Sequence, residues 1–317
     1  MKRKLQLPKN LIGILTFSTL SLLIFVFPAF GAAPSHGTSS AEYLTEETPP
    51  SIDIVGGSVV PSGKYPYHVA ILQDARGPDS YWAYWCGGTL IHQQWVLTAA
   101  HCVQNEDTGQ ITQPGRLQVL VGAVELDASD GTRIGVSQVI PHPEFTSAWD
   151  KDIALIRLSQ PAILGSEVQT IPIVNSPSSP LIDPGIDSVV TGWGTTSTWG
   201  FLWVDKLREV TVPIVSNAAC QLAYNDMGLT ITSNILCAGE DGLDACFFDS
   251  GGPLVVQNAA HNGYLLAGVV SFGHDDGCGA DGRYGGYIRA PAFLQWINDT
   301  TGQAATSYKI YLSLVIR

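Results

Sequence analysis

From Ile54 onward, the chain consists of short apolar runs separated by turn-forming residues. The runs are rich in β-branched and aromatic side chains, and Gly, Pro, Asn and Asp recur between them. The clearest runs are residues 67–72, 95–98, 117–121, 153–158, 189–191, 209–214, 254–256 and 264–271. Short strands repeated in this way predict an all-β domain built as barrels or as a sandwich.

A helical period appears only near the end of this region. Phe293, Trp296 and Ile297 stand at i, i+3 and i+4, which places them on one face of a helix. Pro291 precedes them and suits the first turn of a helix, where its missing N–H is not needed. We therefore expect a closing helix with Pro291 in its first turn.

The N-terminal part is typical of a secreted precursor. Basic residues 2–4 precede an apolar run at 11–30 and the small residues Gly31-Ala32-Ala33, which predicts a signal peptide over residues 1–31, cleaved after Gly31 or Ala33. The run is also long enough for an uncleaved membrane anchor, although Pro28 and the small residues favour cleavage. Residues 32–53 are poor in large apolar side chains and predict a flexible propeptide.

The remaining boundaries follow from these. Residues 54–300 form the expected folded domain, and residues 301–317 are a weakly β-like tail to which we assign no function. Asn298 begins an N-x-T sequon, which matters only in a host that glycosylates secreted proteins.

Charge excludes one class of partner. The formal net charge is −12, and residues 1–53 carry four basic and four acidic residues, so the mature protein is equally acidic. Nucleic-acid binding needs Lys and Arg to neutralise phosphates, so we do not expect a nucleic-acid partner.

The chain has an even number of cysteines behind a signal peptide, which predicts three disulfides formed in an oxidising compartment. Their spacing alone leaves fifteen pairings open. A zinc site is disfavoured because there is no C-x-x-C pair and no histidine-rich cluster. The cysteines are Cys86, Cys102, Cys220, Cys237, Cys246 and Cys278.

Three short segments carry residue types that together perform nucleophilic catalysis. His101 ends an apolar strand beside Cys102, Asp152 opens the run 153–158, and Ser250 lies in a glycine-rich segment. A serine hydroxyl needs a base such as histidine to become a nucleophile, and a buried carboxylate can orient the imidazole. Taken singly, each has an ordinary structural explanation as a turn or surface residue. The order His–Asp–Ser matches one known order of a catalytic triad.

Together with further motifs, these segments resemble the trypsin-like serine proteases of the chymotrypsin family over about residues 54–299. Each motif is weak alone, but their order and spacing together are specific. The motifs are Ile54-Val55-Gly56-Gly57, Cys86-Gly87-Gly88-Thr89-Leu90, Thr98-Ala99-Ala100-His101-Cys102, Asp152-Ile153-Ala154-Leu155, Thr191-Gly192-Trp193-Gly194, Cys237-Ala238-Gly239 and Asp249-Ser250-Gly251-Gly252-Pro253-Leu254.

The resemblance implies two packed six-stranded antiparallel β-barrels and a C-terminal helix, with the active site between the barrels. His101, Asp152 and Ser250 would be the catalytic triad. The backbone N–H groups of Phe248 and Ser250 would form the oxyanion hole. No metal or cofactor is expected. The implied disulfide pairing is Cys86–Cys102, Cys220–Cys237 and Cys246–Cys278.

The resemblance also implies a specificity pocket. Asp244 stands where trypsin-like members carry the carboxylate at the pocket floor, and Gly273 and Gly285 stand at the two wall positions. A buried carboxylate demands a cation, so cleavage after Arg or Lys is expected. Ala245 lacks the hydroxyl that would suit an ammonium, which favours Arg because a guanidinium pairs with a carboxylate in bidentate fashion.

Next to the pocket, Ser271 and Phe272 match the strand whose backbone pairs with an extended substrate. Phe272 replaces the family's tryptophan and keeps an aromatic wall.

Two departures from the family pattern concern activation and the oxyanion hole. The family frees the α-amino group of the residue at Ile54 by cleavage after Arg or Lys, and this group pairs with Asp249. Here Asp53 precedes Ile54, so a separate activating peptidase is expected. Phe248 stands where the family has glycine, which adds bulk at a position that donates to the oxyanion.

These observations favour a secreted serine endopeptidase that acts on proteins or peptides after Arg or Lys and meets protein inhibitors. We expect no stable membrane association after signal cleavage. A catalytically silent homologue that acts as a binding or regulatory protein is the alternative. Asp53 and Phe248 lend it support, and the complete triad argues against it. Specificity for apolar side chains is a third interpretation, which Asp244 argues against.

Overall fold

The computed structural model describes residues 55–126, 130–145, 150–197, 199, 204–258 and 263–302. The predicted signal peptide and propeptide, Ile54 and residues 303–317 of the tail lie outside the described residues.

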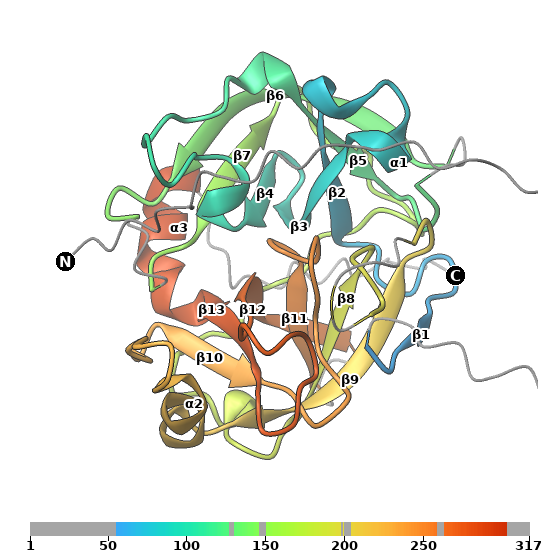
Figure 1. Cartoon of the computed structure of the whole chain (residues 1–317). Helices are drawn as coiled ribbons and strands as arrows, with labels where there is room; N and C mark the ends of the chain where they lie inside the picture. Colours follow the sequence, from blue (N-terminus) through green and yellow to red (C-terminus); the bar gives the residue numbers. More distant parts are fainter. Residues whose placement is uncertain are drawn as a thin grey trace, which may run out of the picture. The chain divides into compact units, whose positions relative to one another are not determined.

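The first half of the described chain closes into an antiparallel barrel with the strand order β2-β3-β4-β7-β6-β5, which the pairing of β5 with β2 completes (Figure 1). Apolar residues that alternate along these strands fill its interior, for example Val69, Ile71, Val96 and Ile156, which share one face of the sheet and are fully buried. The strands are β2 (His68–Gln73), β3 (Tyr84–His92), β4 (Trp95–Thr98), β5 (Leu117–Val121), β6 (Thr132–Pro141) and β7 (Ala154–Leu158).

The second half forms a sheet in which β9 also pairs with β8, so six of its strands close into a second antiparallel barrel. The short strand β1 (Ser58–Val59) extends this barrel by pairing with β9. The expectation of two six-stranded barrels is therefore confirmed. The six barrel strands are β8 (Asp187–Gly192), β9 (Arg208–Val215), β10 (Ile235–Ala238), β11 (Pro253–Asn258), β12 (Gly263–Phe272) and β13 (Gly285–Arg289).

Helices are few in the described chain. The short α1 (Ser80–Ala83) precedes β3, and α2 (Asn217–Tyr224) follows β9. Helix α2 is not among the elements expected from the sequence, and its start is capped by the Ser216 hydroxyl accepting from the Ala219 N–H at 3.1 Å. Short 3₁₀ turns span Asp74–Arg76, Ala100–Cys102, Pro114–Arg116, Pro180–Ile182 and Ala290–Phe293. Across the described residues, no helix is long and apolar enough to cross a membrane.

The closing helix α3 (Leu294–Thr301) is present, but Pro291 lies in the 3₁₀ turn before it and not in its first turn. The backbone of Phe293 departs from helical geometry (φ −108°, ψ 10°) and separates the two segments. Figure 1 shows α3 returning to the first barrel. There the rings of Phe293 and Trp296 lie 5.4 and 5.1 Å from the ring of His142.

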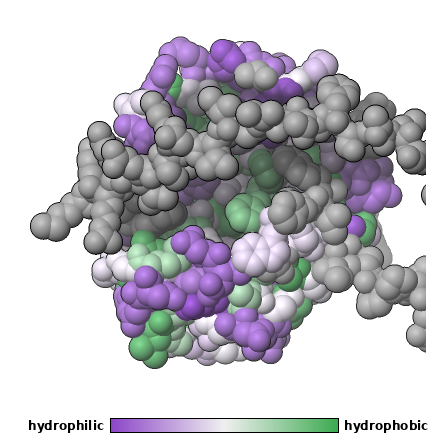
Figure 2. Space-filling model, viewed as in Figure 1, coloured by the Kyte–Doolittle hydropathy of each residue, from purple (hydrophilic) through white to green (hydrophobic). Residues whose placement is uncertain are grey.

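The two barrels meet where β3 faces the segment that precedes β11. The N–H of Gly87 donates to the carbonyl of Ser250 at 2.8 Å. A β-carbon at Gly87 would come within 2.8 Å of the Gly252 Cα, so the backbones can approach this closely only because no side chain intervenes. In the space-filling view, hydrophilic residues cover much of the visible described surface, and an apolar area lies between the barrels (Figure 2).

Candidate active site

The first barrel positions His101 and Asp152 against each other. His101 lies in the 3₁₀ turn after β4, and Asp152 lies just before β7, the strand that pairs with β4. The Nδ1 of His101 lies 2.7 Å from Oδ2 of Asp152, and the backbone N–H of His101 donates to Oδ1 at 2.8 Å. The carboxylate thus holds both the ring and the main chain of His101, in an orientation that leaves Nε2 for chemistry.

Opposing effects set the pKa values of this pair. Burial lowers the pKa of His101, but the charge of Asp152 and the hydrogen bond to it outweigh burial and raise the pKa above its usual 6.5. Asp152 is only 3% exposed. Burial raises its pKa, and the charge of His101 with hydrogen bonds from His101 and Ser271 lowers it below the usual value. The carboxylate therefore stays ionised beside the imidazole.

A third group completes the surroundings of Asp152. The hydroxyl of Ser271, on β12 of the second barrel, donates to Oδ2 of Asp152 at 2.6 Å. The family resemblance implies only a backbone role toward substrate for Ser271, so this contact is an additional one. Nothing local in the sequence signals it, because the two residues are 119 positions apart.

The segment that carries Ser250 lies against the His101 turn. The carbonyl of Ser250 accepts from the N–H of Gly87, and the Sγ of Cys102 lies 3.7 Å from the same carbonyl. Cys102 follows His101 in the chain and is bonded to Cys86. The fold therefore brings all three residues selected from the sequence, His101, Asp152 and Ser250, to the junction of the two barrels.

Phe248, two residues before Ser250, has a backbone that L-residues rarely adopt. Its φ is +74°, and among the described residues it is the only non-glycine with positive φ. The peptide on each side is anchored: the Phe247 carbonyl accepts from the Thr195 N–H at 2.9 Å, and the Phe248 carbonyl accepts from the Tyr84 hydroxyl at 2.8 Å. In a trans peptide the N–H points opposite to the carbonyl, so the Phe248 N–H points away from Thr195.

Asp244 is a buried acid whose charge has no partner cation among the described residues. It is 4% exposed, its Oδ2 accepts from the Gly279 N–H at 3.4 Å, and its Oδ1 has no hydrogen-bond partner among the described residues. Burial, the dominant effect, raises its pKa to about 8. The free-energy cost of burying this carboxylate is avoided if Asp244 is protonated at neutral pH or if a ligand supplies a cation.

The two glycines chosen as pocket walls have different surroundings. A β-carbon at Gly285 would lie 2.5 Å from Oδ1 of Asp244, so any side chain there would collide with the carboxyl group. A β-carbon at Gly273 would meet nothing within 4 Å. Ala245 is buried beside Asp244, and the Cys246–Cys278 disulfide links the segment after Asp244 to the loop between β12 and β13. A side chain at position 285 would therefore collide with Asp244, whereas the space beside Gly273 is open.

Asp249 is fully buried and is held by backbone donors. Its Oδ1 accepts from the Gly194 N–H and its Oδ2 from the Cys246 N–H, both at 2.8 Å. Burial raises its pKa to about 7, despite these bonds. Ile54, its predicted ion-pair partner, lies outside the described residues.

The structure joins the cysteines as Cys86–Cys102, Cys220–Cys237 and Cys246–Cys278, which is the pairing that the resemblance implies.

One cluster of potential metal ligands lies away from these residues, near the end of α2. Asp226, His274 and Asp276 come close enough to share an ion. The guanidinium of Arg283, however, pairs with Asp226 at 2.7 Å and with Asp276 at 2.8 Å. The cluster is thus an ion-pair network in which both carboxylates already share a cation.

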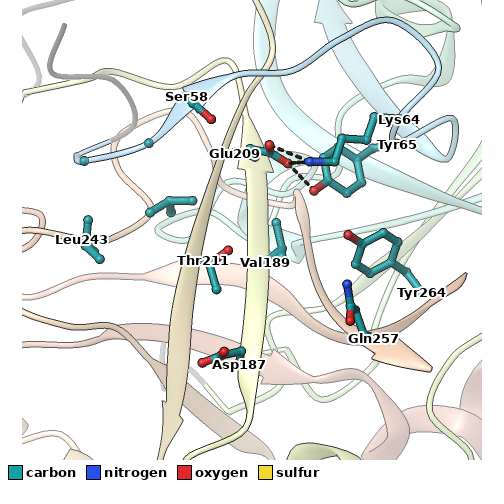
Figure 3. Close-up of a pocket in the computed structure, with 13 residues that line it drawn as sticks. Ser58, Lys64, Tyr65, Asp187, Val189, Glu209, Thr211, Leu243, Gln257 and Tyr264 are labelled. Atoms are coloured by element: carbon teal, nitrogen blue, oxygen red, sulfur yellow. Dashed lines mark hydrogen bonds and ion pairs between the residues drawn. The ribbon is translucent and has the colours of Figure 1, made fainter. Parts of the chain in front are cut away.

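A hollow of about 580 Å³ lies on the outer face of the second barrel, beside β8 and β9. Figure 3 shows its main charged group, Glu209, accepting from Lys64 and from the hydroxyl of Tyr65. Gly56 and Gly57 of the Ile54 motif line it, and the triad does not. Because Glu209 is already paired with Lys64, the cation among the lining residues, we assign no function to this hollow.

The geometry agrees with what comparisons of the sequence show. The family model for trypsin matches residues 54–297. Mouse (Mus musculus) tryptase is 38% identical over 253 residues, which cover 77% of this chain and 87% of the tryptase. Bovine (Bos taurus) anionic trypsin is 35% identical over 253 residues, covering 78% of this chain and 89% of the trypsin. Human (Homo sapiens) trypsin-3 is 34% identical over 252 residues, covering 78% and 72%.

Proposed function

Because the chain belongs to the trypsin family of serine proteases, we propose that it is a secreted endopeptidase that cleaves after Arg and, less readily, after Lys. The observation that carries this proposal is the His101–Asp152 pair at 2.7 Å, which lies beside the Ser250 segment at the junction of the barrels. The Asp244 carboxyl, whose Oδ1 has no hydrogen-bond partner among the described residues, supports the specificity.

In the proposed mechanism the Ser250 hydroxyl attacks the scissile carbonyl and Nε2 of His101 accepts its proton. Asp152 stabilises the imidazolium that forms, and the Ser271 hydroxyl keeps the Asp152 carboxylate oriented. His101 then gives the proton to the leaving amine, which departs and leaves an acyl group on Ser250. A water molecule, deprotonated by His101, hydrolyses that ester and restores the serine.

The backbone N–H groups of Phe248 and Ser250 are the proposed donors to the oxyanion. A backbone donor survives any non-proline substitution, so Phe248 retains it provided that its peptide keeps its orientation. The bonds from Thr195 to the Phe247 carbonyl and from Tyr84 to the Phe248 carbonyl support that orientation. Each such donor contributes roughly 3 kcal/mol to the transition state.

Specificity is assigned to Asp244, Ala245, Gly273 and Gly285, with the backbone of Ser271 and Phe272 aligning the substrate strand. Asp244 is buried without a cation, and its Oδ1 lacks a donor. The guanidinium of a substrate Arg supplies both. Ala245 offers no hydroxyl to an ammonium, which is the basis for preferring Arg over Lys.

Maturation is proposed to remove residues 1–31 and then 32–53, so that the domain 54–300 begins at Ile54. The new α-amino group would pair with Asp249, whose burial disfavours its ionised form without a nearby cation. A second peptidase would make this cut, because a pocket built for Arg does not accept Asp53. Protein substrates and protein protease inhibitors are the expected partners, in an extracellular setting.

A serine-directed phosphonylating reagent tests the central claim. The mature protein and its His101→Ala variant are treated with the reagent, and the labelled peptide is sequenced. We expect the label on Ser250 alone and its loss in the variant. A mature protein that takes no label and hydrolyses no Arg ester would instead be a silent homologue with a binding or regulatory function.

A further inference from the structure

A cation lies on two aromatic rings beside the Ser250 turn. The guanidinium of Arg76 lies 5.0 Å from the ring centroid of Trp85 and 5.6 Å from that of Phe248. The two rings meet edge to face, with centroids 6.5 Å apart and planes inclined by 72°. We call these three half-buried residues the Arg76 platform.

Both rings of the platform are fixed to the segments that carry His101 and Ser250, and Arg76 is held beside them. The indole N–H of Trp85 donates to the carbonyl of Cys102, the residue after His101, at 2.9 Å. Phe248 lies two residues before Ser250, with both of its flanking peptides anchored. Arg76 ends the 3₁₀ turn after β2, and its Nε donates to the Trp82 carbonyl at 3.4 Å. The charge therefore has a defined place relative to His101 and Ser250.

The charge of Arg76 is also available. Arg116 pairs with Asp74 at 2.6 Å and Arg283 pairs with two aspartates, whereas Arg76 forms no ion pair with any carboxylate in the described part of the chain. Cation–π contact leaves the edge of a guanidinium free to donate, because the face and not the N–H groups meets the ring. In a protein with a formal net charge of −12, this is a local positive site.

If the proposed function holds, only the part of the substrate that follows the scissile bond, its leaving half, reaches the Arg76 platform. The acyl half of the substrate aligns with β12 and places its side chain above Asp244. The leaving half then runs from Ser250 away from β12, toward the Cys86–Cys102 disulfide that touches the Ser250 carbonyl. Trp85 directly precedes Cys86. Since an extended chain advances about 3.3 Å per residue, the platform lies within reach of the first few residues of the leaving half.

We propose that the Arg76 platform is a subsite that binds an acidic side chain among the first three residues after the scissile bond. The enzyme would thereby favour sequences in which a basic residue is followed closely by Asp or Glu. Arg76 provides the charge, and Trp85 and Phe248 hold it in place. Phe248 then has a second consequence besides its bulk, because a glycine there would remove one of the two rings under Arg76.

Quenched fluorescent peptides with one Arg and either Asp, Asn or Lys at each of the three following positions test the proposal. At low ionic strength we expect kcat/KM about fivefold higher for Asp than for Asn at one of these positions, and lower for Lys. In Arg76→Gln the Asp-to-Asn ratio falls to about one. Higher salt reduces the ratio in the wild type, because an exposed pair is screened.

Arg116→Gln is the matched control, because Arg116 is an exposed arginine that is already paired with Asp74 and lies outside the platform. It leaves the ratio at the wild-type value, and Trp85→Leu lowers it. A wild type that cleaves after Arg without acidic preference at any of the three positions overturns the subsite and leaves the proposed function standing. So does a ratio that Arg76→Gln does not change. A protein that cleaves no Arg substrate overturns both.

Discussion

The hydroxyl of Tyr84 donates a 2.8 Å hydrogen bond to the carbonyl of Phe248. Tyr84 opens β3 of the first barrel, and Phe248 lies in the second half of the chain, so the bond crosses the junction of the barrels. Its acceptor, Phe248, is the one non-glycine residue in the described part of the chain whose φ is positive. A side chain in the first barrel thus restrains the backbone that is proposed to hold the oxyanion.

Tyr84→Phe removes this bond and leaves a partly buried carbonyl without its donor. We expect kcat on a small Arg ester to fall about tenfold, which corresponds to roughly 1.4 kcal/mol, together with a lower Tm. A second change, Phe248→Gly, restores much of the rate, because glycine adopts positive φ without strain. Equal kcat values for Tyr84→Phe and the wild type would show that the Phe248 peptide needs no such restraint.

Phe248→Gly alone separates steric from chemical effects of the phenyl ring. We expect a nearly constant rate on a small Arg ester and much tighter binding of Kunitz-type inhibitors, because the ring obstructs bulky ligands and the N–H donor is retained. Inhibition constants and ester kinetics on the same preparation measure both. A gain in ester turnover of about 10²-fold would instead indicate that the native hole is distorted.

The pH profile reports on His101. As the proposed base, His101 acts only when neutral, and Asp152 raises its pKa above 6.5 against the effect of burial, so kcat/KM should fall to half its maximum at a pH above 6.5. In Asp152→Asn the charge of Asp152 is gone and burial is opposed only by the smaller effect of the Glu106 charge, which moves the imidazole pKa downward. The rate of this variant should fall by about 10⁴ because the amide favours the wrong tautomer. Titration of the imidazole by NMR checks the direction, and a wild-type midpoint below 6.5 contradicts it.

Asp244 should exchange a proton for a cation. With a pKa of about 8, the Asp244 carboxyl is mostly protonated at pH 7 when no ligand is bound. Binding of benzamidine, an aromatic amidinium, should therefore release nearly one proton. Calorimetry in two buffers of different ionisation enthalpy counts it. Affinity should rise about tenfold per pH unit between pH 6 and 7.5.

Asp244→Ser abolishes both the proton release and the preference for Arg over other residues, while Ser250 still reacts with small esters. A peptide library that shows dominant cleavage after Phe or Leu in the wild type would exclude the pocket assignment.

The active form should begin at Ile54. N-terminal sequencing of active protein from its natural source tests this, and recombinant precursor incubated alone should stay unprocessed because Asp53 does not fit an Arg pocket. Blocking the new α-amino group by carbamylation should abolish activity, since Asp249 then has no cation. Full activity with part of the propeptide attached would rule out the Ile54–Asp249 pair.

Strands of the barrels were predictable where an uninterrupted apolar run lies between turn-forming residues. Runs such as 95–98 and 117–121 coincide with β4 and β5. Strand β6 was not predictable, because only Ile134 and Val136 of its residues are buried and its pattern TRIGVSQVIP has few consecutive apolar residues. Strand β3 contains Gly87 and Gly88, which look like a turn. Instead, Gly87 allows the second barrel to pack closely, and Gly88 leaves room for Val69 and Val96 inside the first barrel.

The residues of the candidate site likewise divide into those that the sequence predicts and those that it does not. Motifs locate His101, Asp152 and Ser250 because each has a local sequence signature. The Ser271 and Tyr84 hydroxyls have none, since their partners are 119 and 164 positions away. Local sequence also says nothing about the backbone of Phe248, whose positive φ occurs between two carbonyls that accept from Thr195 and Tyr84.

The contact between Gly87 and Ser250 has a consequence for how activity is acquired and lost. His101 and Asp152 come from one barrel, and Ser250 with Ser271 comes from the other. Each half, produced separately, would be chemically inert, and mixing the halves would create a protease only if they docked in register. Activity therefore depends on how the two barrels dock. During gentle denaturation, turnover should disappear while the strands of both barrels still give an unchanged far-ultraviolet circular dichroism spectrum.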